Sequence, residues 1–387
     1  MRYAWISWML AMVGILGCGE VKDQVVPAAT DHAGAAQWKS QVPWPAVRDE
    51  AGLDEVVWVP TKTGGSAARV AFDGENYLSV WQDARTGVSS VYGMRFREDG
   101  TVLDPIGFPV SVRATSSTSP VVSFNGQDFL VVWLDARNQG SDVYGARVSR
   151  GGEVMDPDGI GIQTQGYPKY GPTLSSNGVD YMVAWRYVHP TDLGLYVMRV
   201  SAQGVPLDPV GNLVSAGQNY WPYITWAGTH FLITYNDHRV GTHVSAARVG
   251  PNATVLDPGG FQMSWSLPYE AFTGVASDGV NSLGVYYYYQ YNFGNQIRGV
   301  RIDSDGNLLE SSHLHLGAPF KPVNQVVQEP GVTFVDGNYL VVYNDYRNGA
   351  DHELYLNAVL PDGTVVHPGG VRSEERRVGK ECRSRWS

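Results

Sequence analysis

The chain has 387 residues, 43% of them hydrophobic, and a formal net charge of −10. It is large and apolar enough to bury a sizeable core, and its two cysteines are too few for a disulfide framework, so packing must stabilise the fold. Binding to the phosphate backbone of a nucleic acid requires a basic surface, so this acidic composition argues against a nucleic-acid partner.

The first residues are typical of an exported protein. Met1-Arg2-Tyr3 is followed by the apolar stretch Ala4–Leu16, which is too short to span a bilayer. The end of this stretch, Ile15-Leu16-Gly17-Cys18, resembles the bacterial lipobox, in which the cysteine becomes the lipidated first residue of the mature protein. We therefore predict a lipoprotein signal peptide over 1–17 and lipid attachment at Cys18. The alternative is an ordinary secretory peptide with an incidental cysteine.

The segment after the signal peptide favours a tether on a membrane. Residues 18–50 are rich in Ala, Pro, Val and Gln without a clear hydrophobic period, which is typical of a flexible linker. Gly19 and Glu20 follow Cys18, whereas an Asp after the cysteine resembles an inner-membrane retention signal in some bacteria. We expect a protein of the cell envelope, anchored by lipid in the outer membrane or at the cell surface.

The rest of the chain is a repeat. Its turn glycines recur at intervals of 50 to 58 residues, at Gly74, Gly126, Gly178, Gly228, Gly279 and Gly337. Within the first unit, four short alternating segments are separated by turn residues: Ala68–Phe72, Tyr77–Trp81, Val91–Phe96 and Phe108–Val112. Four antiparallel strands per unit are typical of one blade of a β-propeller. Residues 51–371 are thus predicted to form an all-β propeller of about six four-stranded blades, with an open solenoid or two β-sandwiches as alternatives.

The two ends of the repeat array suggest how the ring closes. Val56–Phe72 aligns without a gap on Phe108–Phe124, so residues 56–60 are expected to supply an outer strand. The sixth unit stops at Val371, where its own outer strand would begin, and we expect the N-terminal strand to complete it. Residues 372–387 match no repeat and resemble a translated adaptor sequence. A non-native tail would mean that the natural chain continues, and a seventh blade is then possible.

The repeated motifs Leu-Val-Val-Trp, Asp-x-Arg, Tyr-Gly-x-Arg-Val and Leu-Asp-Pro resemble the repeats of largely uncharacterised lipoproteins of myxobacteria and their relatives. The resemblance covers about residues 56–371. It implies a secreted, propeller-like repeat protein and supplies no catalytic residues.

Charged residues recur once per blade, which favours a structural role. An Asp-x-Arg pair follows the second strand of four units, and its members are Asp83, Arg85, Asp135, Arg137, Asp237, Arg239, Asp345 and Arg347. Another arginine recurs on the third strand, at Arg95, Arg147, Arg199, Arg248 and Arg301. We expect the carboxylates to hold loop amides and the arginines to bridge blades.

Two sharper interpretations of these charged residues compete with the structural one. Sialidases are propellers in which several arginines hold the substrate carboxylate, but their Asp-box pattern is absent here, and we predict no enzyme activity. Asp303–Asn307 with Glu310 is faintly similar to a calcium loop. An ordinary turn is the alternative, and we predict no metal or other cofactor.

Aromatic residues gather in the loops that vary between units. In a propeller, the loops after the second and fourth strands share one face, and variation on one face often marks a binding surface. These loops contain Tyr167, Tyr170, Tyr187, His189, Tyr220, Trp221, Tyr269, Tyr291 and Phe293. Such side chains stack on sugar rings or anchor proteins, although they also fill gaps between blades. We predict a monomeric glycan- or protein-binding module, with a structural envelope component or a sialidase-like hydrolase as alternatives.

Overall fold

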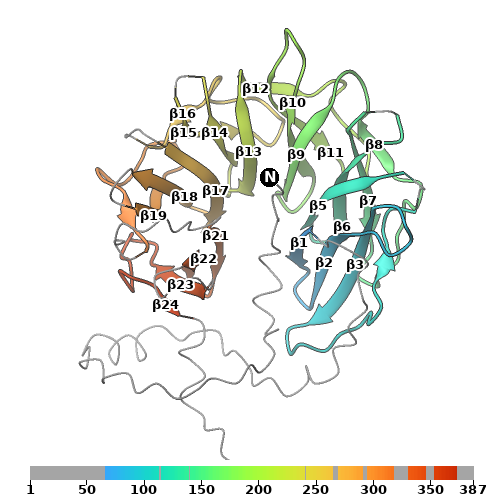
Figure 1. Cartoon of the computed structure of the whole chain (residues 1–387), viewed down its shortest axis with the longest axis horizontal. Coiled ribbons are helices and arrows are strands. Elements are labelled where there is room, and N and C mark those ends of the chain that lie inside the picture. The colour runs from blue at the N-terminus through green and yellow to red at the C-terminus, as the bar shows by residue number, and fades with distance from the viewer. Residues whose placement is uncertain are drawn as a thin grey trace, which may run out of the picture.

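The computed structural model describes residues 66–112, 115–138, 140–239, 241–264, 269–290, 294–317, 330–345 and 353–372. In these ranges the chain forms twenty-four strands in six four-stranded sheets and no helix. The sheets follow one another around a ring, as blades of a propeller do (Figure 1). The prediction of six four-stranded blades is thereby confirmed.

Each blade is one contiguous stretch of chain, and its antiparallel strands are neighbours in the order of the sequence. Blade 1 consists of β1 (Ser66–Phe72), β2 (Asn76–Asp83), β3 (Ser90–Arg97) and β4 (Phe108–Pro109). Blade 2 consists of β5 (Ser117–Phe124), β6 (Phe129–Asp135), β7 (Asp142–Val148) and β8 (Ile160–Gln163). Blade 3 consists of β9 (Lys169–Ser176), β10 (Tyr181–Tyr187), β11 (Gly194–Val200) and β12 (Asn212–Ala216).

The second half of the ring repeats this pattern. Blade 4 consists of β13 (Asn219–Trp226), β14 (Phe231–Asp237), β15 (His243–Val249) and β16 (Phe261–Gln262). Blade 5 consists of β17 (Tyr269–Ser277), β18 (Ser282–Gln290), β19 (Gly294–Ile302) and β20 (Leu314–His315). Blade 6 consists of β21 (Gly331–Val335), β22 (Asn338–Asp345), β23 (Glu353–Val359) and β24 (Val371–Arg372).

The core of the molecule lies between the blades. All seven residues of β6 are buried, and so are all seven of β14, because a second strand has a neighbouring blade on each of its two faces. Leu130 and Val132 of blade 2, for example, belong to one buried cluster with Tyr181 and Val183 of blade 3. The first strands of successive blades also contact one another, from β1 to β5 and onward to β21.

Tight turns between the first and second strands account for the recurring glycines. In blade 1, an oxygen of Asp73 accepts hydrogen bonds from the amides of Glu75 and Asn76. Gly74 has a φ of 98°, in the left-handed region that residues with a Cβ rarely adopt. Asn125, Asn177 and Asp278 make the same kind of turn in blades 2, 3 and 5.

The structure differs from the sequence-based prediction at the outer edge of the sixth blade. β24 pairs with β23 and occupies the fourth position there, so this blade is completed by its own repeat. Residues 56–60, which we expected at this position, lie outside the described residues, as do 1–17, 18–50 and 373–387. A two-residue outer strand is enough to fill the position, as β4, β16 and β20 also show.

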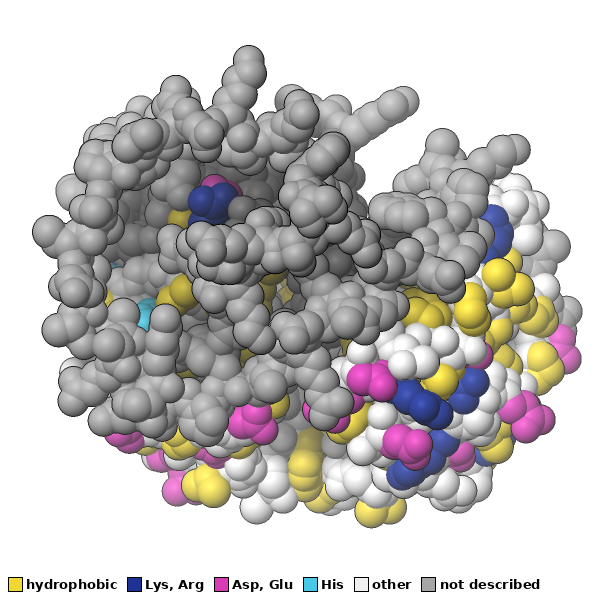
Figure 2. All heavy atoms as spheres, turned by 90° about the horizontal axis from the view of Figure 1, so that it is seen from below, with side chains coloured by type: hydrophobic (Ala, Val, Ile, Leu, Met, Phe, Trp, Pro, Cys, Tyr) yellow, Lys and Arg dark blue, Asp and Glu magenta, His cyan; other side chains and the backbone are white. Residues whose placement is uncertain are grey.

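The described part of the face in Figure 2 carries hydrophobic side chains together with charged groups of both signs. In the view of Figure 2, Lys and Arg side chains lie beside Asp and Glu side chains on the described part of the face. None of the described segments is a helix with the length and apolar character needed to cross a membrane.

Candidate functional site

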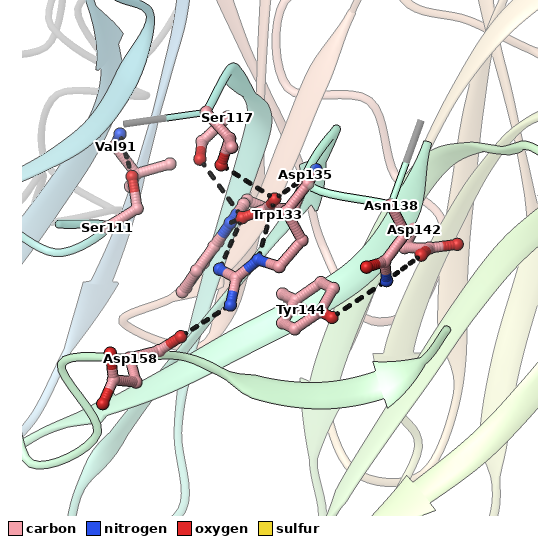
Figure 3. Close-up of polar contacts among 11 residues, drawn as sticks. Val91, Ser111, Ser117, Trp133, Asp135, Asn138, Asp142, Tyr144 and Asp158 are labelled. Carbon is pink, nitrogen blue, oxygen red and sulfur yellow. Dashed lines mark hydrogen bonds and ion pairs between the residues drawn. The ribbon is translucent and has the colours of Figure 1, made fainter. Parts of the chain in front are cut away.

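The Asp-x-Arg pairs form compact polar clusters within single blades. Asp135 is buried at the end of β6, where it accepts a hydrogen bond from the indole of Trp133 at 3.0 Å (Figure 3). Arg137 donates to the same carboxylate through Nη2 at 2.7 Å and lies 3.9 Å from the ring centre of Tyr144. Burial works to raise the pKa of Asp135, but the hydrogen bonds from Arg137 and Trp133 outweigh it and hold that pKa below its ordinary value.

The same cluster recurs in other blades. Asp83 in blade 1 accepts from Trp81 and Arg85, and Asp237 in blade 4 pairs with Arg239. In both blades the side chain of the aspartate is largely or wholly buried. Asp345 is buried at the end of β22, whereas Arg347 lies outside the described residues. Asp83, Asp135 and Asp237 are neutralised within their own blades, which leaves little of their charge for a ligand.

The third-strand arginines pair with acidic residues in their own blades, and those of blades 1, 4 and 5 also reach the next blade. Arg95 binds both oxygens of Asp104 in its own blade, and its Nη1 donates to the carbonyl of Arg150 in blade 2 at 2.9 Å. Corresponding pairs in the same blade are Arg147–Asp156, Arg199–Asp208, Arg248–Asp257 and Arg301–Glu310. Arg248 and Arg301 likewise reach carbonyls of the following blade, at Ser304 and Pro361. Sequence reasoning missed the acidic partners, which follow each arginine by nine residues in the turn.

Glu310 therefore has a structural partner in the stretch that resembles a calcium loop. It replaces the aspartate of the other repeats and pairs with Arg301 at 2.6 Å. Asp303 accepts from the amides of Asp305 and Asn307, as a turn residue does. Among the described residues, no group of three or more His, Cys, Asp or Glu side chains is arranged to hold a metal ion.

The predicted ligand face is only partly described. Tyr167 and Tyr170 are exposed, with 49% and 45% of their surface accessible, while Tyr187, His189, Tyr220 and Trp221 are half-buried. Tyr269 is the first residue of β17, and nothing is described of its side chain. Tyr291 and Phe293 lie outside the described residues. The six described side chains come from blades 3 and 4 and their connections, and they form two groups.

The first group, which we name the blade 3 cluster, consists of Tyr167, Tyr187, His189 and Tyr196. The ring of His189 lies 4.2 Å from that of Tyr167 and 6.2 Å from that of Tyr187, and Tyr196 packs against Tyr187 at 5.7 Å. The Tyr187 hydroxyl accepts a hydrogen bond from the amide of Tyr167. Tyr196 donates to Asp192, and burial together with this carboxylate raises the pKa of Tyr196.

The second group, the inter-blade cluster, consists of Tyr170, Arg186, Tyr220, Trp221 and His238. Tyr170 is on β9 and Arg186 on β10 of blade 3, whereas Tyr220 and Trp221 are on β13 of blade 4. The guanidinium carbon of Arg186 lies 4.0 Å from the ring centre of Tyr220 and 5.8 Å from that of Tyr170. Ring centres of Trp221 and His238 are 5.5 Å and 4.7 Å from that of Tyr220.

A buried ion pair holds the start of β9 next to this cluster. Lys169 is fully buried, and its Nζ lies 2.7 Å from Oδ1 of Asp142 in blade 2. The other oxygen of Asp142 accepts from Asn138, which also lies close to Tyr144 (Figure 3). A buried charge without its partner is strongly destabilising, so this ion pair links blade 3 to blade 2 directly beside Tyr170.

The backbone of Trp221 is strained. Its φ is 47°, which is rare for a residue with a bulky side chain. The first strand has a bulge here, because the pairing of β13 with β14 shifts register between Tyr220 and Tyr223. The same positive φ recurs at the bulge of β5, at Ser119, so this conformation belongs to the first strand of the repeat.

Arg186 and His238 were not among the predicted site residues. A signal for Arg186 exists in the sequence, since Trp185-Arg186-Tyr187 replaces the Trp-x-Asp of blades 1 and 2. Burial lowers the pKa of His238; the carboxylate of Asp237 works against this, and the charge of Arg186 adds to it. His238 itself follows the Asp237 of an intact motif, so only the packing of the two blades reveals its place in the cluster.

Comparison with known proteins finds distant structural similarity and no relative by sequence. No family model and no curated protein matches the chain. Similar solved structures include a subtype N10 neuraminidase-like protein of A/little yellow-shouldered bat/Guatemala, which is 11% identical with a TM-score of 0.47 and is matched over 79% of this chain and 94% of that one. The periplasmic gluconolactonase of Pseudomonas aeruginosa is 17% identical with a TM-score of 0.46, over 73% and 77% of the two chains.

The β-propeller domain of the Trilobed protease from Pyrococcus furiosus is 10% identical with a TM-score of 0.44, over 77% of this chain and 84% of that one. Similarity this distant carries no information about activity or ligand.

Proposed function

We propose that the protein is a lipid-anchored β-propeller of the cell envelope that binds glycans through the aromatic side chains of blades 3 and 4. The observation that carries the proposal is the convergence of Tyr170, Tyr220 and Trp221 from two adjacent blades. Aromatic rings with polar tips offer flat apolar surface to the C–H faces of a sugar and hydrogen-bonding groups to its hydroxyls.

The aromatic groups are held by the rigid part of the fold. Tyr170, Tyr187, Tyr220 and Trp221 belong to strands, and the buried Lys169–Asp142 pair holds the first of them in place. A ligand that meets preformed rings loses little affinity to the ordering of side chains. The fixed positions of these rings support a binding surface. Tyr167 and Tyr170 are exposed, which argues against side chains that merely fill gaps between blades.

The nearby carboxylates favour binding over hydrolysis. Glycosidases that use two carboxyl groups place them on either side of the bond they cleave. Among the described residues beside the two aromatic clusters, Asp192 accepts from Tyr196, and Asp237 is paired with Arg239. Both carboxylates are engaged in contacts within their own blades, so we propose a binding module and no hydrolase activity.

The glycan proposal is tested by ligand-induced stabilisation. The full chain is screened against neutral and acidic oligosaccharides and cell-wall fragments, and we expect a subset to raise the melting temperature, since binding to the folded state stabilises it. Tyr170→Ala/Trp221→Ala is expected to weaken binding about tenfold or more through loss of ring contacts.

Phe72→Ala is the matched control for this variant. Phe72 is a partly exposed aromatic side chain at the end of β1, and it lies outside both clusters. Unchanged affinity in the double variant would contradict this face, and a response to envelope proteins in place of sugars would favour a protein ligand.

The lipid anchor is tested separately. Metabolic labelling with a palmitate analogue is expected to mark the wild-type protein and not Cys18→Ser. Labelling that persists in Cys18→Ser would show that Cys18 is not the attachment site.

A further inference from the structure

The inter-blade cluster contains a positive charge that no acidic side chain neutralises. Each arginine of the repeat motifs, from Arg85 to Arg301, has a carboxylate partner in its own blade. The side chain of Arg186, by contrast, has no ion pair and no hydrogen bond within the described part of the chain, and its guanidinium lies near the rings of Tyr170 and Tyr220. It is half-buried, so it also lacks the full hydration of a surface arginine.

The rings leave a defined part of the guanidinium available. A cation over a ring is attracted through its flat face, and this leaves the N–H donors at the edge of the plane for other partners. Nε of Arg186 is enclosed and has no hydrogen-bond partner in the described structure, and the same holds for Nε2 of His238 in the same cluster. A ligand cannot reach these enclosed atoms directly, so the donors that Arg186 offers to a ligand are its terminal amino groups, which are not enclosed.

The geometry points to a carboxylate. A guanidinium presents parallel N–H donors whose spacing matches the two oxygens of a carboxylate group, and such a pair is stronger than a neutral hydrogen bond. We propose that the inter-blade cluster binds an acidic saccharide, with Arg186 holding the sugar carboxylate and Tyr220 and Trp221 packing against the sugar ring. This assignment rests on the proposed glycan-binding function and specifies its ligand class.

The net charge of the whole chain does not favour binding of an acidic saccharide. The net charge of −10 repels an anionic ligand at long range, so selectivity for the acid must come from contacts in the cluster. A single arginine also limits the salt dependence of binding, in contrast to the steep dependence of surfaces that release many counterions.

The test compares an acid with its own ester. Trigalacturonate and its methyl ester have the same rings and hydroxyls and differ in the carboxylate charge, and affinities of the full chain for both are measured by titration calorimetry. We expect the acid to bind at least about tenfold more tightly than the ester. In Arg186→Gln this preference should disappear, while Arg186→Lys, which keeps the charge and loses the fork, should retain only part of it.

Arg150→Gln is the matched control. Arg150 packs on Phe124 of blade 2 and donates to the carbonyl of Gly126, away from the cluster, so its replacement should leave the preference unchanged. Melting temperatures show whether each variant folds. If Arg186→Gln does not fold, the carboxylate assignment is judged from the acid-over-ester preference of the wild-type protein and of Arg186→Lys.

The possible failures are distinguishable. Equal affinity for acid and ester in the wild-type protein, or a preference that survives in Arg186→Gln, overturns the carboxylate assignment and leaves glycan binding intact. Neutral oligosaccharides that bind while trigalacturonate does not would overturn it in the same way. If no saccharide of either class binds, both the assignment and the proposed function fail.

Discussion

Blades 2 and 3 have the same four strands, yet they end their second strands differently. In blade 2, Trp133 is followed by Asp135 and Arg137, whose charges cancel within one compact cluster. In blade 3, Trp185 is followed by Arg186 and Tyr187, and the guanidinium lies near the rings of Tyr170 and Tyr220. An intact Asp-x-Arg motif thus stabilises its own blade. The interrupted motif of blade 3 has an arginine without a carboxylate partner among the described residues, and this is the group to which we assign the ligand.

Blade 5 offers a third variant of the same position. Its second strand carries Tyr286 and Tyr288 in place of the tryptophan and aspartate, and Tyr286 is hydrogen-bonded to His313 of the connection before the outer strand. Arg298 stacks on Tyr288 at 3.6 Å and donates hydrogen bonds to the side-chain oxygen of Gln296. The ionic cluster of blade 2 is thus replaced by neutral contacts around a stacked arginine.

The largest expected effect comes from breaking the paired cluster. Asp135→Ala leaves Arg137 and the indole of Trp133 without their shared acceptor and should cost about 3 kcal/mol of unfolding free energy. Arg186→Gln, at the interrupted motif, should change it by less than about 1 kcal/mol, because no ion pair is lost. Urea unfolding curves of both variants measure the difference, and equal losses would mean that the two blades do not differ in this respect.

A smaller effect is expected at the joint between blades 1 and 2. Gly152 has a φ of 84°, and a Cβ there would lie 2.6 Å from Nε of Arg95, the arginine that reaches across the joint. Gly152→Ala should therefore cost roughly 1–3 kcal/mol. The neighbouring Gly151→Ala is the control and should be within about 0.5 kcal/mol of wild type, since its nearest neighbour would be 3.4 Å away. Equal melting temperatures for the two variants would contradict this role of the joint.

The smallest effect concerns pH in blade 5. Burial, with the nearby charges of Arg298 and His315, lowers the pKa of His313 to about 4. The folded protein therefore takes up this proton later than the unfolded chain as the pH falls, and stability should decline from pH 6.5 toward pH 4. The loss should be on the order of 1 kcal/mol at this half-buried site. His313→Gln should flatten the decline in a thermal-melt series, and an unchanged slope would exclude His313 as its source.

The joints between blades also mark where the repeat ends. Val359 forms a β-bridge with Val365 as Val148 does with Val154, so Ala358 occupies the third-strand position of blade 6 that is equivalent to Arg147. His367 stands nine residues later, where the other blades carry an acidic partner. The series of arginines that reach into a following blade therefore stops at the last blade of the described chain.

Much of the frame could be predicted because its signals are local. The alternation around Trp133 and the Asp-Gly and Asn-Gly turns specify strands and hairpins within a few residues. Asp135 and Arg137 are two residues apart, so their contact needs only the local loop. The partner of Arg147 was missed because Asp156 also belongs to a turn motif, and its side chain meets the arginine only when β7 and that turn fold together.

The sequence by itself determined a repeat of about six four-stranded blades, since each repeat encodes its own strands and turns. The tertiary structure decided which blade supplies each outer strand and which aromatic side chains of the variable loops come together. Arg186 and Tyr220 are 34 positions apart in the sequence, and the guanidinium contacts the ring because blade 4 packs against the face of β10 that carries Arg186. Whether a charge is neutralised depends on such contacts between blades, and no pattern within one repeat contains them.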